Sequence, residues 1–243
     1  MSRVVVVTGG GKGIGLAVVA RFAGAGDRVV AVGRDRAALE ASGAASAEVC
    51  DVADEEQVAT LFARLGPIDV LVNNAGLARG APVRRTSLDE WRAHLDVNAT
   101  GAFLCTRAVV GGMIERGHGR ILTIASTAGK VGGRYTAAYA ASKHAAVGLM
   151  RAVAAEVAGT GVTANAVCPT WVRTELTTRA VERIVAVTGR SEEEARVELV
   201  RQSPLGRLLE PEEVAFAVEF LAAPEVAAIN GQTLVLDGGG LQA

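Results

Sequence analysis

A tyrosine and a lysine four residues apart are the strongest candidates for chemistry in this sequence. Tyr139 and Lys143 lie in the run Tyr-Ala-Ala-Ser-Lys, and Ser126 lies thirteen residues upstream. Residues four apart share one face of a helix, one turn from each other. A phenol, with a pKa of about 10, is a poor acid–base catalyst at neutral pH, but a neighbouring ammonium favours the phenolate and lowers that pKa. The pair therefore predicts acid–base chemistry by Tyr139.

A glycine-rich segment follows the first predicted strand and opens a helix. It runs Thr-Gly-Gly-Gly-Lys-Gly-Ile-Gly from Thr8 to Gly15. Glycines in this position allow a tight turn and let the backbone approach a pyrophosphate, which the helix N-terminus stabilises. The spacing differs from the usual dinucleotide fingerprint, and the segment lacks the Gly-Lys-Ser/Thr ending of a P-loop. It therefore indicates a dinucleotide site and argues against nucleoside triphosphate chemistry.

The elements that must position these residues are predicted from the apolar pattern. Short β-branched runs alternate with helical segments, and their continuous apolar character is typical of strands buried on both faces of a parallel sheet. Strands are expected at residues 3–7, 28–32, 47–50, 70–73, 119–125, 162–168 and 233–236. Helix-start signals occur at Asp54 with Gln57, Ser87 with Glu90, and Pro211 with Glu212 and Glu213. The pattern predicts one Rossmann-like, doubly wound α/β domain over residues 1–243, with helices on both faces and ligands at the carboxyl ends of the strands.

Composition excludes several classes of partner. The 243 residues carry 25 basic and 26 acidic side chains, which gives no electrostatic case for binding nucleic acid or an anionic membrane. We expect no membrane span and no signal peptide, and hence a cytoplasmic protein. The three cysteines are expected to be buried and unpaired: Cys50, Cys105 and Cys168. No metal is predicted, because three histidines lack ligand spacing and are expected on the surface or on helix faces: His94, His118 and His144.

These motifs together resemble the short-chain dehydrogenase/reductase (SDR) family over nearly the whole chain. The matching pieces are the glycine-rich segment, Asn73-Asn74-Ala75-Gly76, Asn98, Ser126, Tyr139 and Lys143. The resemblance implies that Tyr139 is the acid–base residue and that Ser126 positions the substrate oxygen. It further implies that Lys143 lowers the pKa of the tyrosine and binds the nicotinamide ribose, while Asn98 holds a water between Lys143 and solvent.

The resemblance also implies how a dinucleotide binds. The glycines cradle the pyrophosphate, Asp51 and Val52 border the adenine, and the turn after the fourth strand supports the cleft. Val172 and Thr174 contact the nicotinamide carboxamide. The complete expected set is Gly9, Lys12, Gly13, Ile14, Gly15, Arg34, Asp51, Val52, Asn74, Ala75, Gly76, Tyr139, Lys143, Pro169, Val172 and Thr174.

The choice of cofactor is argued from charge. A carboxylate at the end of the second strand accepts from the ribose 2′-hydroxyl of NAD, whereas an arginine accommodates the 2′-phosphate of NADP. Here Gly33 ends the strand and Arg34 follows, with Lys12 expected near the same corner. Asp35 would partly offset these charges, but the pattern favours NADP(H) over NAD(H).

Two segments leave alternatives open. Residues 174–207 form a charge-rich helical insertion, which is either a set of solvated helix faces or a lid over the substrate. Just before it, Thr170 stands where the family commonly has glycine. A β-branched residue does not easily adopt positive φ, so we expect this loop to differ in shape. The adjacent Trp171 is a pocket wall, a lid anchor or simply a packing residue.

The expected function is reduction of a ketone by NADP(H). Similarity to β-ketoacyl and polyketide ketoreductases indicates a small-molecule carbonyl substrate, either free or thioester-linked. A carboxylate or phosphopantetheine arm could be held by one of the loop arginines: Arg79, Arg84, Arg134 or Arg173. The alternatives are an NAD-dependent dehydrogenase of a β-hydroxy acid or secondary alcohol, and a non-catalytic dinucleotide sensor. Family members are commonly homotetramers, which implies an interface formed by helices 99–116 and 139–157.

Overall fold

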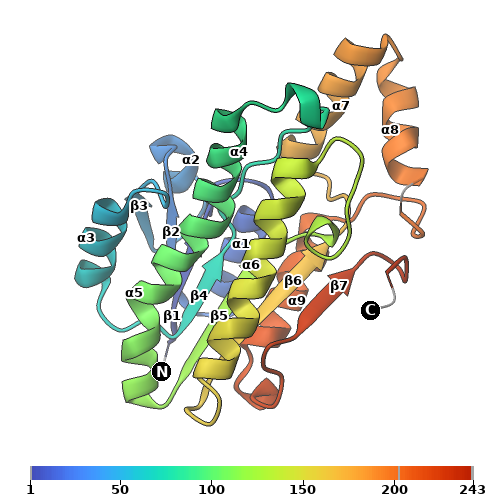
Figure 1. Ribbon diagram of the computed structural model, residues 1–243. Helices are drawn as coiled ribbons and strands as arrows, with labels where there is room; N and C mark the ends of the chain where they lie inside the picture. The colour runs from blue at the N-terminus through green and yellow to red at the C-terminus, as the bar shows by residue number, and fades with distance from the viewer. Residues whose placement is uncertain (1, 202, 242–243) are drawn as a thin grey trace.

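The computed structural model describes residues 2–201 and 203–241, and its centre is a parallel β-sheet (Figure 1). The strands are β1 (Val4–Thr8), β2 (Arg28–Gly33), β3 (Ser46–Val49), β4 (Val70–Asn73), β5 (Gly119–Ile124), β6 (Val162–Pro169) and β7 (Thr233–Leu236). Their order is β3-β2-β1-β4-β5-β6-β7, and neighbouring strands are parallel throughout. The predicted doubly wound sheet is confirmed, and all seven predicted strands occur within one residue of their expected bounds.

Helices cover both faces of the sheet. They are α1 (Gly13–Gly24), α2 (Arg36–Glu40), α3 (Glu55–Leu65), α4 (Leu88–Leu95), α5 (Gly101–Arg116), α6 (Ala137–Glu156), α7 (Glu175–Thr188), α8 (Glu192–Arg201) and α9 (Pro211–Ala222). Short 3₁₀ turns are η1 (Val83–Arg85), η3 (Thr127–Gly129) and η4 (Pro224–Val226), and a π-helical turn, η2 (Asp96–Thr100), joins α4 to α5. Figure 1 shows α5 and α6 in front of the sheet, with α1 and α9 behind it.

Each face has its own apolar core. One core joins the strands to α3, α5 and α6, and the other joins them to α1, α2 and α9. Adjacent residues of β1 show why both form: Val6 packs into the first core, whereas Val5 and Val7 pack into the second. Successive side chains of a strand point to opposite faces, so a strand buried on both sides needs an uninterrupted apolar run.

The predicted helix starts are confirmed. Asp54 caps α3 by accepting from the backbone N–H of Gln57, and Ser87 and Glu90 form a capping box at α4. Helix α9 begins with a proline at its first position, where no intrahelical donor is lost.

A long apolar helical stretch follows the cap at Ser87. The helical segments α4, η2 and α5 run end to end as Leu88–Arg116, which is long and apolar enough to span a membrane by length and composition alone. Its buried residues include Leu104, Val109 and Met113, which pack into the core on one face of the sheet. The start signal at Ser87 is local to the first turn of α4. It does not predict that η2 joins α4 and α5 into one continuous helical stretch.

The carboxyl ends of the strands define where a ligand can lie. The chain builds outward from β1 to β3 and then returns to place β4 on the other side of β1. This reversal leaves a crevice at the carboxyl ends of β1 and β4, where ligands bind in open α/β sheets. The glycine-rich segment follows β1, and Asn74-Ala75-Gly76 follows β4. The two motifs predicted from spacing are therefore brought to the same crevice.

Within the predicted insertion 174–207, residues 175–201 project from this edge as the helical hairpin α7–α8 (Figure 1). The hairpin has a small core of its own, formed by Val181, Ala195 and Leu199. Trp171 packs against that core, together with Ile184 and Val185 of α7. The interpretation of Trp171 as an anchor for the hairpin is therefore favoured by its packing.

Candidate active site

The turn after β1 has the shape of a cradle that side chains would fill. Gly9 and Gly13 have φ of 66° and 52°, values that residues with a Cβ rarely adopt. A Cβ added to Gly15 would lie 2.1 Å from the carbonyl oxygen of Gly9. Helix α1 begins at Gly13, so unpaired N–H groups of its first turn face the crevice. The cradle fits a pyrophosphate, because these N–H groups and the helix dipole favour an anion.

Two side chains fix the cradle to the end of β4. The hydroxyl of Thr8 accepts from the backbone N–H groups of Asn74 and Ala75, at 2.9 and 3.0 Å. The amide of Asn74 donates in return to the carbonyl oxygens of Thr8 and Gly9, at 2.9 and 3.2 Å. The two sides of the crevice are therefore held together without a ligand.

Lys12 and Arg34, the two cations expected near the ribose 2′ position, each form an ion pair with a carboxylate. Arg34 lies 3.6 Å from Asp51, and Lys12 lies 2.9 Å from Asp35. The hydrogen bond from Lys12 lowers the pKa of the Asp35 carboxyl and raises that of the lysine. The Lys12 and Arg34 side chains are 56% and 75% exposed, so both ion pairs lie in solvent. Another anion can readily replace the carboxylate in each pair.

The remaining predicted cofactor residues take different positions. Val52 is buried in the core against Gly101, so only its backbone is available to a ligand. Thr174 lies across the crevice from the cradle, since a Cβ on Gly13 would be 3.1 Å from its Cγ2. Pro169 is the last residue of β6, and Val172 pairs with Leu209 in an isolated bridge. Ile14 is partly buried on the inner side of α1.

Thr170 causes no backbone strain. Among residues 2–201 and 203–241, the one non-glycine residue with positive φ is Tyr135. The N–H of Thr170 donates to the carbonyl of Leu236, which extends the pairing of β6 with β7 by one residue. A threonine fits here because the chain stays in register with the neighbouring strand.

The structure brings Ser126 and Tyr139 into contact. Ser126 follows β5, its hydroxyl accepts from the N–H of Ala128, and it hydrogen-bonds the Tyr139 phenol. Burial raises the pKa of the Tyr139 phenol, and the bond to Ser126 opposes that rise. The phenol is therefore a protonated group at neutral pH, suited to giving a proton to a substrate oxygen.

Lys143 lies one turn along α6, buried below the tyrosine ring. Only 5% of it is exposed, and its Nζ is 5.9 Å from the centroid of the Tyr139 ring. Nζ donates to the carbonyl oxygen of Ile124 at 2.7 Å. Burial lowers the pKa of the ammonium to about 8. The expectation that Lys143 lowers the pKa of the Tyr139 phenol is not confirmed. Burial is the largest influence on the pKa of both side chains, and it raises that of the phenol.

Asn98 is in the π-helical turn η2, and its side chain hydrogen-bonds the backbone of Leu77. Its Oδ1 accepts from the N–H of Leu77 at 2.7 Å, and its Nδ2 donates to the Leu77 carbonyl and to the Ser142 hydroxyl, at 2.9 and 2.8 Å. One lone pair of Oδ1 is left for a water. A Cβ on Gly76 would lie 3.4 Å from this oxygen and 3.7 Å from Lys143 Nζ, so the glycine keeps the space beside both open.

Two residues at the site were not predicted to be there. His94 was expected on the surface or a helix face, yet it is 1% exposed and packs edge-on to Tyr139, with ring centroids 6.4 Å apart. Its spacing, one turn before Asn98, is the signal that could have found it. Cys168 is buried as predicted, and its thiol accepts from the backbone N–H of Ser126. Burial raises the pKa of that thiol, which is therefore not a nucleophile at neutral pH.

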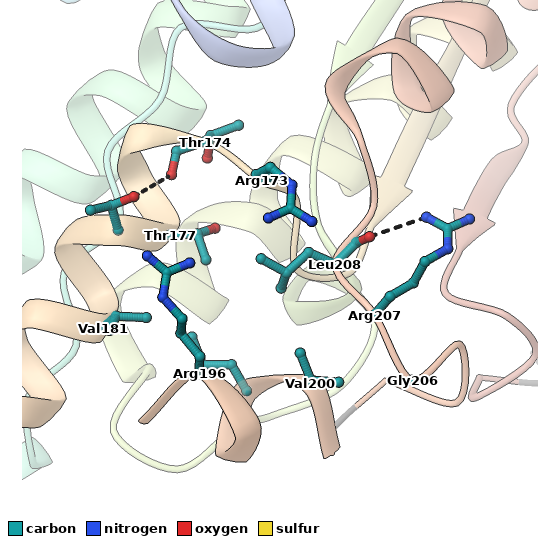
Figure 2. A pocket seen from close by; sticks show the side chains of 11 residues that line it. Arg173, Thr174, Thr177, Val181, Arg196, Val200, Gly206, Arg207 and Leu208 are labelled. Carbon is teal, nitrogen blue, oxygen red and sulfur yellow. Dashed lines mark hydrogen bonds between the residues drawn. The ribbon is translucent and has the colours of Figure 1, made fainter. Parts of the chain in front are cut away.

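A cavity of about 340 Å³ lies beside the hairpin, and Thr174 is part of its lining (Figure 2). It is lined by residues of α7 and α8 and by Gly206–Leu208. Figure 2 shows the side chains of Arg173 and Arg196 reaching toward it from opposite sides. Each is already paired with a glutamate, at 2.9 and 2.7 Å, so the cavity carries little net charge.

A glycine cradle and a Ser–Tyr–Lys group with a buried lysine, on one edge of a doubly wound sheet, define a dinucleotide-dependent oxidoreductase. Comparison with known proteins identifies the family. Residues 9–240 match the family described as enoyl-(acyl carrier protein) reductase, and the chain belongs to the SDR family. The expected family resemblance is confirmed.

Individual relatives are similar over their whole length. A protein named as a ketoacyl reductase of the granaticin polyketide synthase of Streptomyces violaceoruber is 41% identical over 250 residues, covering 97% of this chain and 92% of its own. The acetoacetyl-CoA reductase of Shinella zoogloeoides is 38% identical and covers 98% of each chain. A variant of the actinorhodin polyketide ketoreductase, solved with NADPH, has a TM-score of 0.93 and 39% identity over 98% of this chain and 97% of its own.

Proposed function

We propose that this chain reduces a ketone to a secondary alcohol with NADPH, using Tyr139 as the acid. The observation that carries the proposal is the half-buried, protonated phenol, hydrogen-bonded to Ser126 on the strand edge that holds the glycine cradle. A proton donor at the substrate oxygen is the group that hydride transfer to a carbonyl requires. When bound, the reduced nicotinamide supplies the hydride.

The residues then have separate tasks. Ser126 donates to the carbonyl oxygen of the ketone and orients it toward Tyr139. The Tyr139 Oη–H bond breaks and its proton moves to that oxygen as negative charge develops there. Lys143 contacts the nicotinamide ribose and returns a proton to the phenolate. The free lone pair of Asn98 Oδ1 holds a water on the route from Lys143 to solvent.

The preference for NADP(H) follows from the exposed cations. Arg34 leaves Asp51 and binds the 2′-phosphate, with Lys12 beside it. Gly33, which precedes them, has no carboxylate to accept from a ribose 2′-hydroxyl. The NADPH in the actinorhodin ketoreductase structure supports the same assignment.

The proposed substrate is a β-ketoacyl thioester or a polyketide-like ketone. The names of the relatives, ketoacyl and acetoacetyl-CoA reductases, support this class. Within residues 2–201 and 203–241, Arg79 and Arg84 form no ion pair, in contrast to Arg173, which pairs with Glu210. Their guanidinium groups, on the segment between β4 and α4, are free to bind the phosphate of a thioester carrier.

We also propose a homotetramer working in the cytoplasm, with the α7–α8 hairpin as its substrate lid. Exposed apolar side chains support self-association: Leu88 and Trp91 on α4, Phe103 and Ile114 on α5, and Phe216 and Phe220 on α9. A mass four times the 24.9 kDa of one chain in light scattering would support it, and a monomer mass would contradict it.

The first experiment is to follow NADPH and NADH oxidation with acetoacetyl thioester, a bicyclic ketone and an aryl ketone. We expect turnover with NADPH on the thioester or the polyketide-like bicyclic ketone. Activity confined to NADH, or to NAD with a β-hydroxy acid, would replace the proposal with an oxidative dehydrogenase. NADPH binding without turnover on any of these carbonyls would contradict the proposed substrate class.

A further inference from the structure

We propose that His94 is a positioning residue, which holds the loop between β4 and η1 in place beside Tyr139. The inference rests on the proposed ketone reduction, because it assigns this loop, residues 77–82, as the wall of the substrate pocket next to the acid. His94 belongs to α4, makes no contact with the proposed cofactor cradle, and has no part in the proton transfer described above.

The hydrogen bonds of His94 allow one tautomer. The backbone N–H of Arg79 donates to Nε2 at 3.0 Å, so Nε2 carries no proton. Nδ1 lies 2.6 Å from the carbonyl oxygen of Glu90 and must be the N–H that donates to it. Both nitrogens are satisfied by backbone, and the ring is fixed in one orientation. A neutral, fully paired imidazole is the state in which burial of this side chain is tolerated.

The loop that His94 holds is tied at four residues, to three helical elements and to the segment before α6. Asn98 of η2 binds both backbone groups of Leu77, and His94 of α4 binds Arg79. Arg183 of α7 donates to the carbonyl of Gly80 at 3.0 Å. The N–H of Ala81 donates to the carbonyl of Tyr135 at 2.8 Å. The tie to His94 lies near the middle of the loop, and the ring that makes it also packs against Tyr139.

Position connects this loop to the reaction. The ring of His94 meets that of Tyr139 at an interplanar angle of 72°, so one side chain contacts both the loop and the acid. Asn98 is one helical turn further along and holds the start of the same loop. The tie to Arg79 therefore sets the distance between the pocket wall and the phenol. Loss of the tie will disturb the binding of the ketone more than the binding of the dinucleotide.

A matched pair of amides tests this role. Gln places an oxygen where Nε2 of His94 lies, whereas Asn is one methylene too short to reach the Arg79 N–H. We expect His94→Gln to keep most of the wild-type kcat/KM. We expect His94→Asn to lower kcat/KM about tenfold, mainly through a higher KM for the ketone, because the Arg79 N–H loses its partner and the loop loses this tie. NADPH affinity, measured by fluorescence, stays unchanged in both. His144→Asn is the control, since His144 is exposed on α6 and makes a similar contact to the carbonyl of Ala140.

The outcomes separate the alternatives. A purely structural role would lower thermal stability and NADPH affinity together, with Gln and Asn equally impaired, and that result overturns the proposal. Wild-type kinetics in His94→Asn overturns it too. Tyr139→Phe, measured alongside, tests the proposed function itself: if it keeps turnover, the acid–base assignment fails whatever the His94 variants do. If Tyr139→Phe is inactive and His94→Asn is unimpaired, only the positioning role fails.

Discussion

Two groups of charged and polar side chains lie on the same edge of the sheet and differ in almost every physical respect. In the proposed catalytic group Lys143 is buried: it donates to a backbone carbonyl and its pKa falls to about 8. The proposed 2′-phosphate corner is exposed: Lys12 and Arg34 lie in solvent, paired with Asp35 and Asp51. Burial thus determines protonation at one site, and solvent preserves charge at the other.

The difference matches what each region must do. Acid–base chemistry needs a group whose proton is held in place at neutral pH, and a half-buried phenol bound to Ser126 meets that need. Selecting a phosphate needs a full positive charge whose present partner can be displaced, and an exposed ion pair meets that need. The following variants test the contrast from its buried side to its exposed side.

Tyr139→Phe is expected to have the largest effect. It removes the proton donor without changing the shape of the ring, so we expect kcat to fall by about 10²- to 10⁴-fold. NADPH affinity should not change, because the cradle is formed by other elements. Steady-state kinetics and NADPH fluorescence measure the two quantities separately. Tyr135→Phe, the same change at an exposed position, is the control. A Tyr139→Phe enzyme with near-normal kcat would remove the acid–base role.

Lys143→Met tests the buried side of the contrast through the free energy of unfolding. Burial lowers the pKa of Lys143 from 10.5 to about 8, so keeping it charged in the folded protein costs free energy at neutral pH. Met keeps the length and removes the charge. We expect loss of turnover, with a free energy of unfolding about 2 kcal/mol higher at pH 7 after allowing for the lost hydrogen bond.

The pH dependence of that gain follows from the direction of the shift. The cost of the buried charge is complete below pH 8, where the lysine is charged in the folded and unfolded chains alike. It shrinks as pH rises from about 8 and disappears above 10.5, where both states are neutral. Thermal unfolding of both proteins from pH 7 to 10.5 measures this, with Lys12→Met as the exposed control. A constant difference across this range would contradict the burial argument.

Arg34→Asp tests the exposed side and should have the smallest effect on rate. It replaces the cation by a group that repels a 2′-phosphate and accepts from a 2′-hydroxyl, so we expect KM for NADPH to rise about tenfold with little change for NADH. The effect should weaken at high salt, because the site is exposed. Arg196→Asp, which breaks an exposed pair within α8, is the control. Equal changes for both cofactors would exclude a phosphate contact by Arg34.

Much of the fold could be predicted from local pattern. A strand buried on both faces requires an apolar run, and a helix start requires a cap, so the seven strands and the starts at Asp54 and Ser87 follow from neighbouring residues alone. Tyr139 and Lys143 could be paired because helical spacing is regular. Their distance from Ser126 could be inferred only through resemblance to a family.

What the sequence determined by itself was therefore the order of the elements, the glycine cradle and the types of residue that do chemistry. Tertiary structure decided where burial falls. It buried the side chain of Val52 in the core and packed His94 against Tyr139. It also gave Arg34 and Lys12 carboxylate partners and set the direction of the pKa shifts of Tyr139 and Lys143. The physical reason is that desolvation and pairing depend on residues distant in the chain, which no local spacing records.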